Sequence, residues 1–138
     1  MTIQQTQTTS FKKELYQGIH DLSTDHIYIA LYTSNASLDQ NTTVYSSDNE
    51  ITGSGYTAGG QQLLNPIISS SGYTAYVTFN NASWSGALTA RCALIYNASK
   101  ANRAIAVLDF GSNKTSTTTF TVTMPADTAD SALIRSSN

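Results

Sequence analysis

The sequence predicts a mainly β protein, an antiparallel β-sandwich (Ig-like or jelly-roll-like) with one short N-terminal α-helix. Three observations lead to this fold class. Helical periodicity is confined to the start of the chain, five or six later segments have the length and apolar pattern of strands, and turn residues separate those segments. The 138 residues are enough for one domain with a substantial core.

The chain divides into three parts by composition. Residues 1–9 are polar and aperiodic, so we expect a flexible N-terminal arm. Residues 10–125 contain all of the clearly periodic segments and are expected to form the single β-sandwich domain with its N-terminal helix. Residues 126–138 follow Pro125 and are expected to be a C-terminal tail or a brief extra element.

The predicted helix opens the domain. Phe11, Leu15, Ile19 and Leu22 recur every three or four residues, which gives a helix one apolar stripe. Ser10 precedes this stripe and is expected to be the N-cap, because a serine side chain can accept a hydrogen bond from an otherwise unpaired backbone N–H.

The first predicted strand covers residues 26–33. Both of its faces are largely apolar, so we expect a central strand that is covered on both sides. Residues 34–60 have the composition of a loop. Residues 61–69 and 73–80 then flank a short glycine turn and predict a hairpin. Pro66 cannot donate to a strand ladder, so the first strand of this hairpin is expected at an edge or to contain a bulge.

Two strongly apolar segments, residues 91–96 and 103–110, are expected to pair as central strands around the polar loop "NASKANR". The last predicted strand is "TTTFTVTM", residues 117–124, in which apolar and threonine side chains alternate cleanly. The side chains expected to be buried in these strands and their partners are Ile29, Leu31, Val77, Phe79, Leu94, Val107, Phe120 and Val122.

Composition excludes several classes of function. Charged residues make up 12% of the chain and the net charge is −2, so no general attraction to nucleic acid is expected. No apolar run approaches the ~20 residues needed to cross a bilayer, and the N-terminus lacks the apolar segment of a signal peptide. The single Cys92 excludes an internal disulfide and is expected to be a buried, inert thiol. The sequence predicts no cofactor and no metal site.

Two histidines, His20 and His26, lie near Asp21 and Asp25 and invite a metal or acid–base interpretation. Zinc requires three or four converging ligands, and the sequence contains no HExxH pair and no paired cysteines. We therefore expect solvated or capping histidines at a helix-to-strand junction.

Aromatic residues near loops could contact a ligand. The segment "GSGYTAGG", residues 53–60, lacks the lysine of a phosphate-binding loop, so its glycines are expected to allow positive φ in a tight surface loop. Tyr56 in this segment is a candidate contact residue. Trp84 is either a core ring or a platform on which a sugar could stack.

The loop "NASKANR" is expected to be an exposed hairpin turn rather than a dedicated anion site, because Asn and Ser favour turns through local hydrogen bonds. Lys100 and Arg103 are expected to project from it into solvent, so that Lys100→Glu would leave the melting temperature nearly unchanged. We expect the loop to meet another protein, and the predicted partner-binding residues are Tyr56, Asn97, Lys100 and Arg103.

Several segments, taken in order, resemble a family of small virion-associated proteins of tailed bacteriophages. The segments that carry the likeness are "SFKKELYQGIHDLSTDHIYIALYTSNASLD", "EITGSGYTAGGQQL", "TFNNASWSGALTARCALIYNASKANRAIAVLDFG" and "FTVTMP", within residues 10–125. The resemblance implies a phage origin and a place in the virion, after synthesis in the bacterial cytoplasm of the host. It supplies no catalytic residues.

The first functional hypothesis is a capsid decoration (cement) protein that binds the major capsid protein and sister copies, as a homo-oligomer such as a trimer. The alternative is a tail or baseplate component that contacts host surface glycans through Tyr56, Trp84 or residues near Lys100. An enzyme is not expected. A glycan hydrolase usually needs two carboxylates that flank the scissile bond, and the spacing of the available ones does not bring them together: Asp39, Asp48, Glu50 and Asp109.

Overall fold

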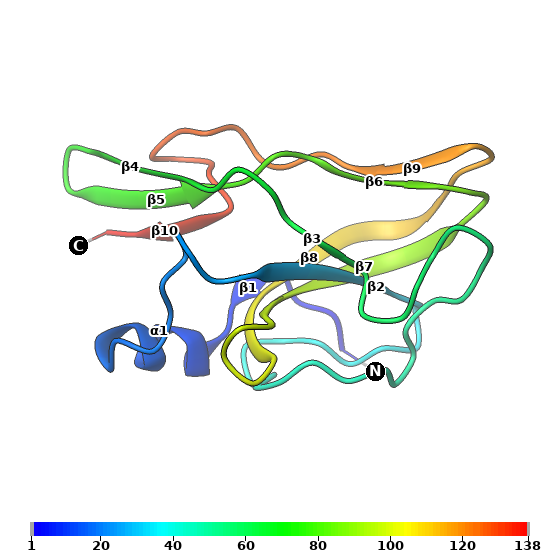
Figure 1. Ribbon diagram of the computed structural model, residues 1–138, viewed down its shortest axis with the longest axis horizontal. Coiled ribbons are helices and arrows are strands. Elements are labelled where there is room, and N and C mark those ends of the chain that lie inside the picture. The colour runs from blue at the N-terminus through cyan, green and yellow to red at the C-terminus, as the bar shows by residue number, and fades with distance from the viewer. Residues whose placement is uncertain (1, 138) are drawn as a thin grey trace.

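The computed structural model describes residues 2–137 and consists of two packed layers of antiparallel strands with one helix at the side (Figure 1). The first layer is a five-stranded sheet. Its strands, in spatial order, are β1 (Thr6–Gln7), β8 (Arg103–Thr115), β7 (Thr89–Asn97), β2 (Ile27–Tyr32) and β3 (Gln61–Gln62). The predicted pairing of the two strands around "NASKANR" is confirmed, since β7 and β8 lie side by side inside this sheet.

The second layer contains two small sheets that lie end to end (Figure 1). One sheet has the order β10 (Ile134–Ser136), β5 (Thr74–Thr78) and β4 (Ile67–Ser71), and the other pairs β6 (Ala82–Ser85) with β9 (Thr119–Val122). The mainly β, sandwich-like architecture with one N-terminal helix is confirmed. As predicted from Pro66, β4 is an edge strand.

The main core lies between the two layers. Alternation along β9 directs Phe120 and Val122 into it and leaves Thr119 and Thr121 exposed. The ring of Phe120 meets the edge of Trp84, with ring centroids 6.4 Å apart. All of the side chains that the sequence predicted to be buried are buried: Ile29, Leu31, Val77, Phe79, Leu94, Val107, Phe120 and Val122.

A second, smaller core covers the opposite face of the five-stranded sheet. The long segment between β2 and β3 runs below the sheet (Figure 1) and places Ala36, Leu38 and Tyr45 against Leu94 and Tyr96. This segment explains why the central strands are apolar on both faces, although no second sheet lies on that side.

The helix α1 (Thr9–Tyr16) begins two residues earlier than predicted. Its N-cap is Thr8 and not Ser10, because the Thr8 hydroxyl accepts the hydrogen bond from the Phe11 N–H at 3.2 Å. The helix ends before Gly18, which takes a φ of +71° that favours glycine and donates its N–H to the Leu15 carbonyl.

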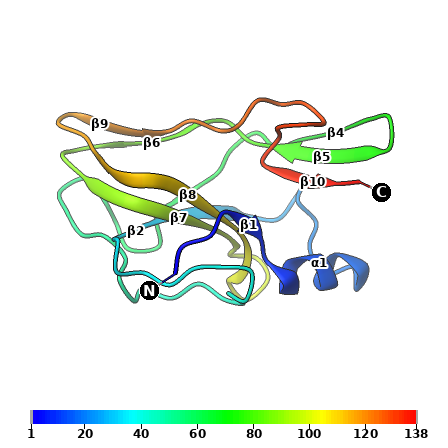
Figure 2. The ribbon, with the colours of Figure 1, turned by 180° about the vertical axis from the view of Figure 1, so that it is seen from behind.

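The expected flexible arm, residues 1–9, is corrected by the structure. Thr6 and Gln7 form β1 and pair with Val107 and Ala106 at the edge of the large sheet (Figure 2), and Thr8 is fully buried. Backbone hydrogen bonds hold these residues, and such bonds require no apolar periodicity. A chain that lacks residues 1–9 would therefore lose both an edge strand and the helix cap.

Two further short strands complete the sandwich. The expected tail contains the brief extra element, β10, whose Ile134 pairs with Val77 of β5. The segment around Trp84, an aromatic residue expected near a loop, forms β6 and pairs with β9. Trp84 is 6% exposed and belongs to the core.

We expect Phe120→Ala to lower the free energy of unfolding by about 3–5 kcal/mol, because the variant removes a buried ring and leaves a cavity beside Trp84 and Phe110. Thr119→Ala is the matched control, since Thr119 is the exposed neighbour on the same strand. Urea unfolding monitored by circular dichroism measures both. Equal midpoints for the parent and Phe120→Ala would contradict the assigned position of β9.

Candidate functional site

Three of the predicted partner-binding residues belong to one polar network between the β7–β8 turn and the start of the chain. We call it the Asn97 network, and it consists of Glu14, His20, Asp25, Asn97, Lys100 and Arg103. Asn97 is fully buried at the end of β7. Its side-chain N–H groups donate to His20 Nδ1 at 2.9 Å and to Asp25 at 2.8 Å, and its Oδ1 accepts from the Ser99 N–H at 3.0 Å.

The hydrogen bonds fix the tautomer of His20. Because the Asn97 amide nitrogen only donates, the Nδ1 of His20 accepts, and its Nε2–H donates to Glu14 at 2.8 Å. Arg103 approaches the other oxygen of Glu14 at 3.3 Å. The network thus ties the hairpin turn to α1 and to the segment before β2.

Asp25 is the most strongly hydrogen-bonded carboxylate of the Asn97 network. Partial burial opposes its ionisation, but hydrogen bonds from Asn97, Lys100 and the Asp21 N–H outweigh it and lower the pKa of Asp25 to about 2. The Lys100 Nζ lies 2.8 Å from both carboxylate oxygens.

These contacts correct the expectation that Lys100 and Arg103 project freely into solvent. Both cations pair with carboxylates of the same chain, although the side chains of Lys100 and Arg103 are 37% and 39% exposed. The reason to expect an unchanged melting temperature after Lys100→Glu is lost, because the new carboxylate would face Asp25. A role of Asn97, Lys100 and Arg103 in binding a partner stays a prediction.

Tyr56 lies in a separate cluster and holds the loop before β3 on the large sheet. Its hydroxyl donates to Glu50 and accepts the Leu31 N–H at 2.9 Å, so both of its hydrogen-bonding functions are used internally. Glu50 also accepts from Tyr45 at 2.6 Å and from the Gly59 N–H at 2.8 Å. Burial, and then the adjacent Glu50, raise the pKa of Tyr56. Its predicted role as a contact residue is untested.

The glycine-rich segment before β3 has the expected structural role. Gly60 has a φ of +80°, and a Cβ at this position would lie 1.8 Å from the Ile29 carbonyl oxygen. Only glycine therefore fits where the segment crosses β2.

The thiol of the single cysteine is also internal. Burial raises the pKa of the Cys92 thiol to about 12, as expected for an inert cysteine. Among the residues that the structure describes, no group of three or more His, Cys, Asp or Glu side chains is arranged to hold a metal ion. No helix within residues 2–137 is long and apolar enough to cross a membrane.

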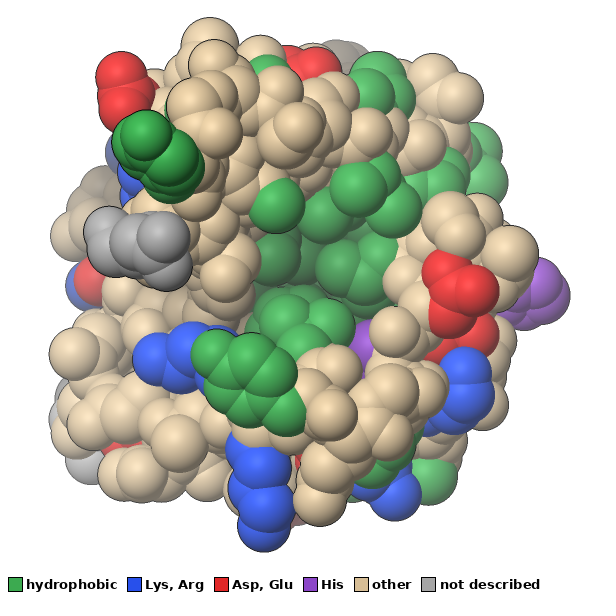
Figure 3. All heavy atoms as spheres, turned by 90° about the vertical axis from the view of Figure 1, so that its left-hand side faces the viewer, with side chains coloured by type: hydrophobic (Ala, Val, Ile, Leu, Met, Phe, Trp, Pro, Cys, Tyr) green, Lys and Arg blue, Asp and Glu red, His purple; other side chains and the backbone are tan. Residues whose placement is uncertain are grey.

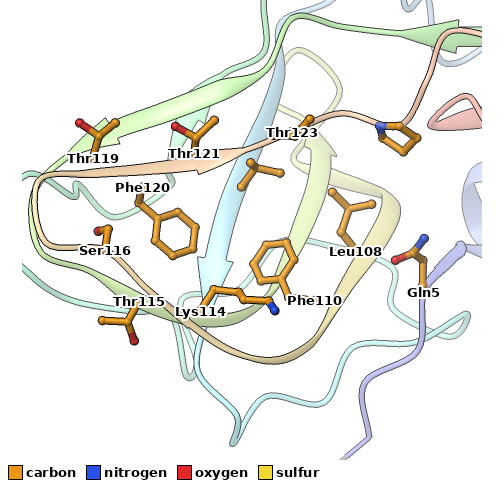
Figure 4. A pocket seen from close by; sticks show the side chains of 12 residues that line it. Gln5, Leu108, Phe110, Lys114, Thr115, Ser116, Thr119, Phe120, Thr121 and Thr123 are labelled. Atoms are coloured by element: carbon orange, nitrogen blue, oxygen red, sulfur yellow. The ribbon is translucent and has the colours of Figure 1, made fainter.

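An open cleft lies at one side of the sandwich, between the end of β8 and β9 (Figure 4). It has a volume of about 590 Å³. Phe110 and Phe120 point into it, with ring centroids 6.3 Å apart, and Leu108 and Val122 extend its apolar wall. Lys114 stands at the rim. Sequence analysis missed this cleft because β8 and β9 were considered only as core strands.

A second uncovered surface is the apolar groove between α1 and the three-stranded sheet, seen as a hollow lined with apolar side chains in Figure 3. Ile68, Val77 and Ile134 form a row across β4, β5 and β10 on one side of this groove. Leu15 and Tyr16 of α1 lie on the other side. The groove exists because the helix is only two turns long and stops short of covering the sheet.

Comparison of the chain with known protein families, with curated proteins and with solved structures gives no match.

We expect the stability of the protein to fall as the pH drops from about 4 through about 2, in part because of Asp25. Its pKa of about 2 in the folded state lies below the unfolded value of about 3.9, so it adds stability above pH 4 that protonation removes. Asp25→Asn should lower the melting temperature at pH 7 and flatten its dependence on pH between 4 and 2.

Thermal unfolding of the parent and the variant from pH 7 to pH 2 measures this difference. Asp48→Asn, which changes an exposed carboxylate outside the Asn97 network, is the control and should follow the parent. A pH dependence that is identical in the parent and Asp25→Asn would show that the carboxylate does not stabilise the turn.

Proposed function

We propose that the protein is a structural component of a tailed-bacteriophage virion, a capsid decoration protein that binds the coat protein of the assembled head and stabilises the shell. The observation that carries this proposal is the apolar groove between α1 and the three-stranded sheet (Figure 3). The resemblance of residues 10–125 to virion-associated proteins supports the phage context.

The groove has the character of a protein-binding surface. Leu15 is 38% exposed, Ile68 is 53% exposed and Tyr16 is 93% exposed, so the free protein leaves large apolar groups in water. Uncovered apolar surface of this kind with a polar rim is typical of contact sites between proteins. Aromatic side chains such as Tyr16 supply much contact area at low entropy cost.

A decoration protein needs no chemistry beyond binding. A ligand that binds the assembled shell but not its open form stabilises the assembled form by mass action, by about 2.7 kcal/mol per site at a hundredfold excess over Kd. Many identical sites on one shell repeat this gain. A modest apolar contact is therefore sufficient, and the low charge of the chain suits a contact of that kind.

The copy number of the chain in purified particles of its own phage tests the proposal. We expect hundreds of copies per particle, as one protein on each unit of a head lattice requires, and earlier rupture on heating of heads that lack the protein. Quantitative mass spectrometry and thermal release of the DNA measure the two effects. A handful of copies would contradict a head location and would instead favour the tail or baseplate.

We expect Ile68→Asp to weaken binding to undecorated heads by about tenfold or more, because a carboxylate would be buried without a partner against the coat protein. Ile67→Asp is the matched control. Ile67 is 41% exposed and adjoins Ile68 on β4, but its side chain points to the opposite face of the strand. Sedimentation of heads with bound protein measures both, and equal loss in the two variants would exclude the groove.

A further inference from the structure

The cleft between β8 and β9 (Figure 4) is bordered on one side by the outer edge of β9, with which no strand of residues 2–137 pairs. We propose that an extended segment of the coat protein adds to the free edge of β9 as an additional strand and places alternate apolar side chains in this cleft. The inference rests on the proposed function, since it names a second element, besides the groove next to α1, that would bind the shell.

The register of β6 and β9 shows which backbone groups face the cleft. The Gly86 N–H donates to the Thr118 carbonyl at 2.8 Å, which makes this position a hydrogen-bonded pair. Hydrogen-bonded pairs recur every second residue in an antiparallel ladder, so Phe120 and Val122 also bond to β6. The N–H and C=O groups of Thr119 and Thr121 therefore point away from β6, and within residues 2–137 no strand pairs with that edge.

The opposite border of the cleft is formed by β8 and is already bonded within the chain. β1 pairs with β8 only at Ala106 and Val107, and within residues 2–137 the large sheet has no further strand beyond this point. Farther along β8 the Asp109 N–H donates to the side chain of Gln5 at 3.1 Å, and the Gly111 N–H donates to Asp109 at 2.8 Å. The free edge of β9 is therefore the border that an extended segment can join, in a way that a helix cannot.

The sequence of β9 lacks the protection that exposed edges usually carry. Free edge strands commonly contain a lysine, a proline or a bulge that prevents pairing with another chain. Thr119–Val122 contains no charged residue and no proline, and its register with β6 is regular. Phe120 and Phe110 lie directly beneath this edge, so an added strand would also cover apolar surface.

The charge of the residues that line the cleft indicates which kind of segment could bind in it. Lys114 is the only charged residue that lines the cleft, and no carboxylate of the described chain forms an ion pair with it. The expected segment therefore has apolar residues at alternate positions and a carboxylate near one end. A second copy that presented the same cleft would bring a second Lys114 and no carboxylate.

Two proline variants test whether the free edge of β9 binds an added strand. Thr121 of β9 and Ser83 of β6 are cross-strand neighbours whose hydroxyls lie 3.1 Å apart. Thr121→Pro removes an N–H that faces the cleft, whereas Ser83→Pro removes one that faces the opposite edge of the same two-stranded sheet. Both variants keep the hydrogen bonds between β6 and β9 and lose the same hydroxyl contact, so their melting temperatures should match.

Binding of each variant to undecorated heads is measured by sedimentation, and the oligomeric state of the free protein by light scattering. We expect Thr121→Pro to bind about tenfold or more weakly and Ser83→Pro to bind like the parent. Equal binding of the two variants, while the parent binds, would overturn the strand proposal and leave the decoration function standing. Failure of the parent itself to bind would overturn both.

Two further measurements keep the test decisive if Thr121→Pro fails to fold. The backbone amides of Thr119 and Thr121 should exchange with deuterium more slowly in head-bound protein than in free protein, and Lys114→Glu should weaken binding most at low salt. Unchanged exchange at both amides would overturn the proposal. A change of oligomeric state in Thr121→Pro, with head binding retained, would assign the edge to a second copy and would also overturn it.

Discussion

The antiparallel ribbon made by β7 and β8 is the constraint on which the rest of the structure depends. It continues past a corner into β6 and β9, so that one long two-stranded ribbon supplies parts of both layers. Ser116 stabilises the corner, since its hydroxyl donates to the Gly86 carbonyl at 2.7 Å and accepts the Leu88 N–H at 3.0 Å. The bend places Phe120 of β9 against Phe110 of β8. The main core forms between the two layers that the ribbon connects.

The same bend creates the uncovered surfaces. Folding a ribbon over itself closes one end of a sandwich but leaves its sides open unless other strands cover them. Beside the β7–β8 ribbon, β2 pairs with β7 over six residues, whereas β1 pairs with β8 over only two. The cleft beside β9 follows from this shortage of edge strands, and the groove under Ile68 follows from the shortness of α1.

Sequence predicted the parts of the fold that depend on apolar periodicity. β2, β7, β8 and β9 each contain enough alternating or continuous apolar residues to be recognised. β1 was not predicted and β10 was expected only as a tail or a brief extra element of unstated type, because two or three residues that bond through their backbones leave no side-chain pattern. The Asn97 network was missed for a different reason. Asn97 and Asp25 are 72 residues apart, and only the pairing of β2 with β7 brings them together.

The distribution of charge explains why binding should depend on backbone edges and apolar contacts. Three of the seven cations, Arg91, Lys100 and Arg103, form ion pairs with carboxylates of the same chain. These pairs fix turns and strand ends, and the surfaces next to β9 and α1 are mainly uncharged, with Lys114 at the first and Lys12 and Arg135 at the second. A neutral edge cannot attract a partner from a distance, but it forms hydrogen bonds and apolar contacts that salt screens very little. Such a contact fits the proposed decoration function, because the binding would persist through large changes of ionic strength.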